Sequence, residues 1–384
     1  FPSLSFSTSQ QVVNRPYQET SSRVSGSEII SSNSKTSYNG NYGLNASWTL
    51  YNGNKRLKTI QQEKLNNQVA ELDVATSENN IQESIAQVYI QILYAAESVK
   101  VNESTLQVSI AQRDRGQELL NAGSIAKSDF AQLEAQVSTD RYQLVTAQAT
   151  LEDYKLQLKQ LLELDGENEM NIYLPALSDE NVLAPLPTKK DVYISALSLR
   201  PEIEASKLNV EASELGIGIA KSSYLPTISL SAGIGTNHTS GSDFTFGEQV
   251  KNGWNNSIGL SVSVPIFNNR QTKSAVQKAK LQYETSMLSL LDEQKTLYKT
   301  IEGLWLDANS AQQRYAAANE KLKSTQISYE LISEQFNLGM KNTIELLTEK
   351  NNLLQAQQEQ LQAKYMAILN TQLLKFYQGD QLAL

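Results

Sequence analysis

The chain has 384 residues, 40% of them hydrophobic, and a formal net charge of −8, which allows two ordinary domains or one elongated architecture. The acidic balance offers no basic face to a nucleic acid, and the absence of cysteine excludes disulfides, thiolate metal sites and cysteine nucleophiles. The single histidine, His238, cannot alone supply a zinc site or a catalytic triad, so we expect no enzyme and no cofactor.

The chain begins at Phe1-Pro2-Ser3, in the middle of a motif that recurs later in the sequence. No initiator Met or signal peptide precedes it, so we expect a processed or truncated product. No later segment approaches the roughly 20 apolar residues that a membrane-spanning helix needs. The predicted elements therefore depend on periodicity.

Four segments alternate apolar residues with small neutral ones and contain no charge: 3–7, 44–50, 228–235 and 260–266. The alternation predicts strands with one apolar and one polar face, as in a barrel between lipid and water. One face of a soluble β-sandwich is the alternative. Trp48, Tyr51 and Phe267 gather at one strand end, where interfacial aromatic residues are expected. Residues 10–42 and 236–255 are expected to be long loops.

Four strands are too few to close a membrane barrel, because lipid tolerates no open sheet edge. The chain is therefore expected to oligomerise. Three copies would supply 12 strands, an even number within the usual range for such barrels.

Two long helices are predicted at about 54–122 and 271–338, because neither stretch contains proline. Heptad seams with apolar residues every three or four positions run through 81–99 and 144–161. Such helices suit an antiparallel coiled-coil tube, and an ordinary coiled-coil rod is the alternative. The proline-containing connector 164–190 is expected to be irregular and to wrap the tube partway down.

The two halves of the sequence repeat one plan. The segment around Gly43 matches the segment around Gly259, and the same offset carries Gly123 onto Gly339. We therefore expect a first repeat over 1–163, the connector, and a second repeat over 191–384. The second repeat begins with an additional helical stretch at 191–222.

This order of elements resembles the outer-membrane efflux (TolC) family. The residues that carry the resemblance are Leu225-Pro226-Thr227-Ile228-Ser229-Leu230, Val264-Pro265-Ile266-Phe267, Arg200-Pro201-Glu202-Ile203 and the turns 123–129 and 339–345. Residues 51–56 (Tyr-Asn-Gly-Asn-Lys-Arg) further resemble members from the Bacteroidetes.

The resemblance implies a homotrimer with a 12-stranded barrel in the outer membrane of a Gram-negative cell and an α-helical tunnel in the periplasm. A periplasmic adaptor protein and an inner-membrane transporter would be its partners. The implied function is the passive exit duct of a tripartite efflux pump or a type I secretion system. A periplasmic coiled-coil adaptor or structural rod remains the alternative, and detergent dependence would distinguish the two.

The resemblance also implies a gate at the helix tips. Lys341 falls at a basic position that bonds to a Thr-Asp pair on a neighbouring tip, and Ser128 and Asp129 match that pair. Glu345 matches an acidic ring of the aperture, and threefold carboxylates there would favour cations. Phe336 replaces a family Tyr and has no hydroxyl to donate, so packing is expected to replace bonding. A set of solvated charges is the alternative.

Overall fold

The computed structural model describes residues 2–17, 21–25, 28–32, 35–164, 172–173, 182–242 and 244–382. Its contacts divide the chain into two compact units, each drawn from both halves of the sequence. The first unit comprises Phe1–Asn67 with Leu208–Met287, and the second comprises Gln68–Lys207 with Leu288–Leu384. The predicted combination of four antiparallel strands with long helices is confirmed.

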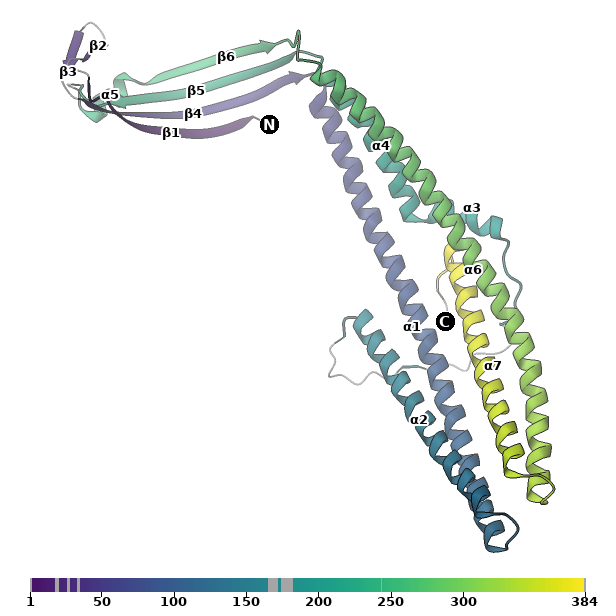
Figure 1. Ribbon diagram of the computed structural model, residues 1–384. Coiled ribbons are helices and arrows are strands. Elements are labelled where there is room, and N and C mark those ends of the chain that lie inside the picture. Colours follow the sequence, from purple (N-terminus) through teal and green to yellow (C-terminus); the bar gives the residue numbers. More distant parts are fainter. Residues whose placement is uncertain are drawn as a thin grey trace. The chain divides into compact units, whose positions relative to one another are not determined.

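The first unit contains a four-stranded antiparallel sheet in the order β1-β4-β5-β6 (Figure 1). Its strands are β1 (Ser3–Asn14), β4 (Thr36–Asn52), β5 (Thr227–Thr239) and β6 (Asn255–Ser263). A separate hairpin joins β2 (Ser21–Ser25) to β3 (Glu28–Ser32), and the short helix α5 (Phe246–Asn252) follows β5. Strands from the two halves of the sequence meet where β4 pairs with β5.

The register of the sheet gathers its apolar side chains on one face. Leu4 pairs with Ala46, Trp48 with Leu230, and Leu230 with Leu260. Directly paired residues of antiparallel strands point to the same side, so these residues share a face. The opposite face carries serine, asparagine and glycine, whose side chains bond across strands, as when Asn45 Nδ2 donates to Ser7 Oγ at 3.4 Å.

The strands differ from the prediction at their ends. Residues 10–42 are largely strand rather than loop, because β1 runs to Asn14 and β4 begins at Thr36. Those extensions are polar and lack the apolar alternation from which strands were predicted. β6 ends at Ser263, short of the predicted 266, since Pro265 has no N–H to donate to a neighbouring strand.

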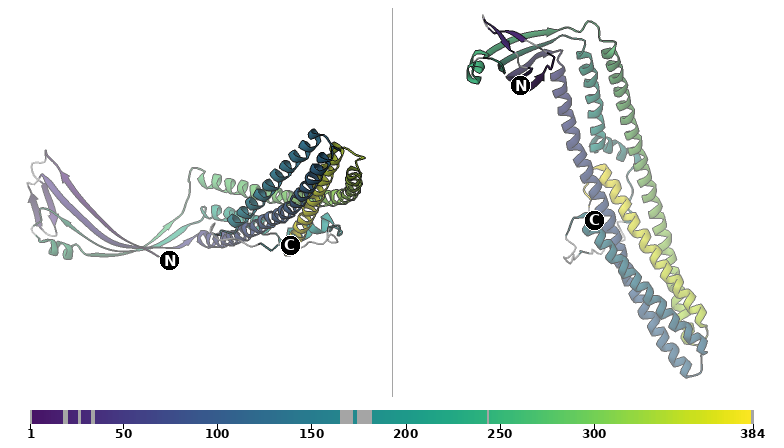
Figure 2. Two further views of the ribbon diagram at one scale, coloured as in Figure 1. Left: turned by 90° about the horizontal axis from the view of Figure 1, so that it is seen from below. Right: turned by 60° about the vertical axis from the view of Figure 1, so that its left-hand side comes forward.

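Each half of the chain supplies one long helix followed by a shorter one. Helix α1 (Lys55–Asn121) and helix α6 (Gln271–Asn337) are both 67 residues long, while α2 (Lys127–Leu161) and α7 (Thr343–Gln378) have 35 and 36 residues. Within the second unit, α2 folds back along α1 and α7 along α6 (Figure 2). We call these pairs the α1–α2 hairpin and the α6–α7 hairpin.

The predicted helical stretch at 191–222 is two helices, α3 (Lys189–Leu199) and α4 (Pro201–Ser222). Arg200 between them is extended, with φ −74° and ψ 123°, because proline disfavours the helical conformation in the residue before it. Pro201 itself suits the first position of a helix, where no N–H bond is needed.

The core of the second unit lies between its helices. One cluster joins α3, α4, α6 and α7 through Val192, Ile203, Ile301 and Leu374, and another joins α1 to α7 through Leu93 and neighbouring residues. Among the described residues, no helix is both long and apolar enough to cross a membrane.

Most of the connector 164–190 lies outside the described residues. Its described end runs along α6, where the Gln312 side chain donates to the carbonyls of Val182 and Ala184 at 2.9 and 2.8 Å. The Trp305 indole donates to the carbonyl of Pro187 at 3.0 Å.

Candidate functional site

The turn of each hairpin is built on a left-handed glycine. Gly123 has φ +71° and Gly339 has φ +73°, a conformation that glycine adopts without steric cost. The N–H of Gly123 donates to the Leu120 carbonyl and the next N–H to that of Leu119, and Gly339 and Met340 repeat the pattern. This is the Schellman ending of a helix, so both predicted tip glycines have a defined backbone role.

The second tip organises its charges around the start of α7. Asn342 caps the helix by accepting from the Glu345 N–H at 2.9 Å, and the Asn342 N–H donates to Glu345 Oε2 at 3.1 Å. Lys341 Nζ lies 2.5 Å from Glu345 Oε1. Both carboxylate oxygens of Glu345 therefore have a donor within one chain, and one of these donors is Lys341.

The two donors to Glu345 have an electrostatic consequence. The hydrogen bond from Lys341, followed by the backbone N–H of Asn342, lowers the pKa of the Glu345 carboxyl below its ordinary value. Hydrogen bonds to the charged form favour ionisation. Glu345 therefore stays negatively charged at pH values where a free glutamate begins to take up a proton.

The first tip uses its acid as a helix cap. Asp129 accepts from the Ala126 N–H at 3.4 Å, at the third position of α2, where a negative charge also suits the helix dipole. Ser128 is exposed. The predicted bond from Lys341 to Ser128 and Asp129 concerns neighbouring copies, so it stays a prediction.

Phe336 is buried, with 3% of its surface exposed, in the last turn of α6. A buried aromatic ring without a polar atom is held by packing alone. The expectation that packing replaces a hydrogen bond of the gate at this position stays a prediction.

The three predicted interfacial aromatic residues lie in the first unit. A register shift between Thr49 and Tyr51 pairs Tyr51 with Ile228, so this irregularity turns Tyr51 onto the same face as Trp48. Phe267 is exposed and lies beyond the end of β6.

A second aromatic group, which was not predicted from the sequence, lies toward the other end of the same sheet. His238 stacks on Tyr42 with ring centroids 5.8 Å apart and contacts the edge of Phe246 at 5.0 Å. Tyr38 lies 5.2 Å from the same imidazole. The apolar face therefore has aromatic side chains toward both ends.

Sequence analysis also missed two buried charged networks in the second unit. Ser109, Asp140 and Lys350 form one of them, with 2%, 1% and 3% of their surfaces exposed. The sequence contains one indication of this network. Leu133, Val137 and Asp140 continue the heptad spacing of 144–161 toward the tip, which places a charged residue on an otherwise apolar seam.

The second network centres on Arg200, which bonds to Glu202 at 2.8 Å and to Glu83 at 3.3 Å. Its guanidinium lies 4.2 Å from the centre of the Tyr377 ring, a cation–π geometry. Sequence reasoning used Arg200 and Glu202 only as part of a family motif.

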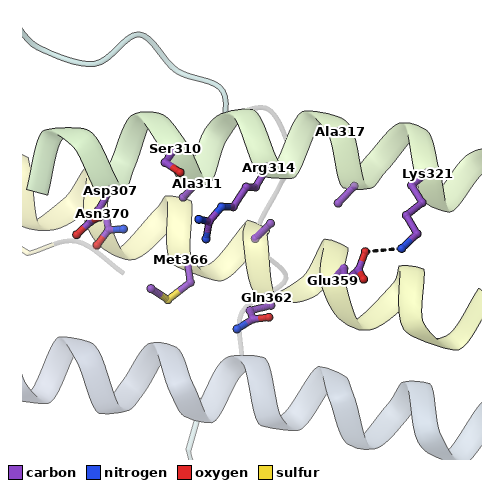
Figure 3. Close-up of a pocket in the computed structure, with 12 residues that line it drawn as sticks. Asp307, Ser310, Ala311, Arg314, Ala317, Lys321, Glu359, Gln362, Met366 and Asn370 are labelled. Carbon is purple, nitrogen blue, oxygen red and sulfur yellow. Dashed lines mark hydrogen bonds and ion pairs between the residues drawn. The ribbon is translucent and has the colours of Figure 1, made fainter.

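An open groove of about 550 Å³ lies between α6 and α7. Figure 3 shows charged side chains along it, among them Arg314 and the ion pair between Lys321 and Glu359, whose nitrogen and oxygen are 2.7 Å apart. Among the described residues, no group of histidine or acidic side chains could hold a metal ion.

Comparison with known proteins agrees with this architecture of strands and paired long helices. The sequence profile of the outer membrane efflux proteins matches residues 1–163 and 192–379. The chain belongs to the outer membrane efflux protein family.

Individual relatives are distant in sequence, and a solved structure has a similar fold. The chain is 24% identical over 294 residues to the outer membrane efflux protein BepC of Brucella suis biovar 1, covering 76% of this chain. It is 23% identical over 311 residues to the outer membrane protein TolC of Escherichia coli K12, covering 79% of this chain. A crystal structure of CusC superposes with a TM-score of 0.80 at 19% identity, covering 99% of this chain and 84% of that one.

The chain spans 61% of the length of BepC and 62% of the length of TolC. Family membership places it in the outer membrane of a Gram-negative cell. It also favours an outer-membrane protein over the coiled-coil adaptor or rod that the helices alone left open.

Proposed function

We propose that this chain is one subunit of a homotrimeric outer-membrane duct, the exit channel of a tripartite efflux pump or a type I secretion system. The proposed duct is a passive conduit rather than an enzyme. One observation carries the proposal: a single chain of this family contains both a sheet with an apolar face and two long helical hairpins. A periplasmic adaptor protein and an inner-membrane transporter are the proposed partners.

The sheet supports the trimer. Within the described residues β1 and β6 are the two edges of the four-stranded sheet, and an open edge is not tolerated in lipid. Pairing β6 of one copy with β1 of the next closes a 12-stranded barrel from three copies. The apolar face then contacts lipid and the serine- and asparagine-bearing face contacts water, with Trp48, Tyr51 and Phe267 as interfacial residues.

The helices support a tunnel with a gate. The equal lengths of α1 and α6 fit a structural repeat over 1–163 and 191–384 around the connector 164–190. Three copies of the two hairpins would form the periplasmic tube, with the turns at Gly123 and Gly339 at its tip. Lys341, Ser128, Asp129, Glu345 and Phe336 would then surround the aperture.

Single-channel conductance of detergent-purified protein in a planar bilayer tests the proposal. We expect discrete, long-lived openings of low conductance, because the gate is mostly closed. Protein that stays soluble without detergent and never inserts would instead identify an adaptor or rod.

Replacing Leu260 by Arg tests which face of the sheet meets lipid. The charge should destabilise the barrel by about 2–4 kcal/mol if it lies near the bilayer midplane. The matched control is Ser261→Arg, one position along the same strand, whose side chain points to the opposite face. Urea titration of both variants in lipid vesicles measures the difference, and equal losses of stability would contradict the assignment.

Glu345 is predicted to give the pore a cation preference that resists acid. Its pKa is lowered by Lys341 and by the Asn342 N–H, so the carboxylate should remain charged to a lower pH than a free glutamate. Reversal potentials measured in a salt gradient as the pH is lowered should show that the preference is lost at a lower pH than the ordinary glutamate pKa of 4.5 would give. Glu345→Ala should reduce the preference at neutral pH, and an unchanged reversal potential would count against a carboxylate ring.

A further inference from the structure

A buried charged network joins three helices of the second unit near the tip. Lys350 on α7 donates to Asp140 on α2 and to Ser109 on α1. Ser109 Oγ in turn donates to Asp140 Oδ2 at 2.5 Å. The network therefore ties the α6–α7 hairpin to both helices of the α1–α2 hairpin.

Neighbouring polar side chains complete the hydrogen bonding of this network. Gln136 donates to Asp140 Oδ1 at 2.9 Å and to Asn351 Oδ1 at 3.5 Å, so both carboxylate oxygens of Asp140 are satisfied. Burial lowers the pKa of Lys350, while Asp140 opposes that shift by bonding to its charged form. A buried ion pair with satisfied partners resists screening by salt.

The network lies where the polar contacts between the two hairpins begin. Residues 113–135 and 330–349, which are all described, form hydrogen bonds and ion pairs only within their own hairpin. The polar links between hairpins begin just above them, at Gln112 with Tyr329, Gln136 with Asn351, and the Lys350 network. Lys350 lies roughly one and a half turns beyond Glu345 on α7.

We propose that Ser109, Asp140 and Lys350 form a clamp that positions the gate, an inference that rests on the proposed duct function. The clamp fixes the two hairpins against each other at one level. The tip segments beyond it, which carry Lys341 and Asp129, move while the clamp stays closed. Lys350 is thus a positioning residue whose effect on the aperture is transmitted through α7.

Lys350→Met tests the clamp, because it removes the ammonium group and keeps an unbranched stem. Open probability in planar bilayers should rise on the order of tenfold, and Asp140→Asn should act in the same direction. The exchange Asp140→Lys with Lys350→Asp should return the channel toward its closed state.

The control is Lys321→Met, which removes an exposed ion pair with Glu359 on the same hairpin and should leave gating unchanged. Channels of Lys350→Met that insert and show the parent open probability would overturn the clamp. Absence of channels from the parent protein would instead overturn the duct function itself.

A second measurement does not depend on destabilising the clamp. The chain has no cysteine, so spin labels can be placed without background in trimers that contain one labelled copy. In the open Lys341→Ala variant, the distance between labels at Ser124 and Met340 should change. The distance between labels at Ser138 and Asn352, level with the clamp, should not. A shift of both distances would contradict a fixed clamp.

Discussion

Arg200→Met is expected to cause a large loss of stability, about 3–5 kcal/mol. Arg200 is 6% exposed and bonds to Glu83 on α1 and Glu202 on α4. Its removal leaves two partly buried carboxylates without a cation, although the methionine can still pack against Tyr377. Thermal unfolding of the purified protein, followed by circular dichroism, measures the loss.

The loss should depend on pH in a defined direction. Burial already raises the pKa of Glu83 above its ordinary value of 4.5, against the opposing pull of Arg200. Without Arg200 the folded-state pKa should rise further, so the folded protein binds a proton that the unfolded chain releases. Stability lost at neutral pH should therefore return as pH falls through the folded-state pKa toward 4.5.

Two controls separate this mechanism from lost packing. Glu83→Gln in the Arg200→Met background should recover part of the stability at neutral pH and weaken its pH dependence. Lys207→Met removes an exposed pair with Glu204 on α4 and should change stability by no more than about 0.5 kcal/mol. An Arg200→Met protein whose deficit is the same at pH 5 and pH 7.5 would refute the buried-carboxylate explanation.

The sequence predicted the helices well because their signals are local. Long stretches without proline that end at Gly123 and Gly339 gave α1 and α6 within a residue or two. The strands were less predictable, since β1 and β4 continue into serine- and asparagine-rich segments whose pairing comes from the neighbouring strand. The irregularity that turns Tyr51 onto the apolar face depends on how β4 is aligned with β5. The sequence of one strand alone does not specify that alignment.

The buried networks were predictable only in part. Lys350 lies between Leu346 and Leu353 at heptad spacing, and both leucines are buried, so a charge on the seam was visible in the sequence. Its partners were not, because Ser109 and Asp140 lie on two other helices and pairing depends on how the helices are aligned. The heptad seam predicted over 81–99 is only partly buried, since Ile92 is buried whereas Ile81 is 47% exposed.

Lys341→Ala is expected to change gating strongly by acting at the tip itself. In one chain Lys341 pairs with Glu345, and the proposed duct adds a bond to Ser128 and Asp129 of the next copy. The substitution removes both interactions at all three tips, so open probability should rise on the order of tenfold. Single-channel recording measures this directly, and leakage of antibiotics into cells that carry the variant provides a second measure.

The nature of the bond gives further tests. Lys341 is partly exposed, so the pair should be weakened by salt, and the parent channel should open more often at high ionic strength. The Lys341→Ala channel should lose that salt dependence. Lys341→Arg should close the gate more firmly, because a guanidinium can bond to a carboxylate through two parallel hydrogen bonds. Lys323→Ala, an exposed lysine on α6, is the matched control, and an equal rise in opening for both alanine variants would show a general charge effect rather than a latch.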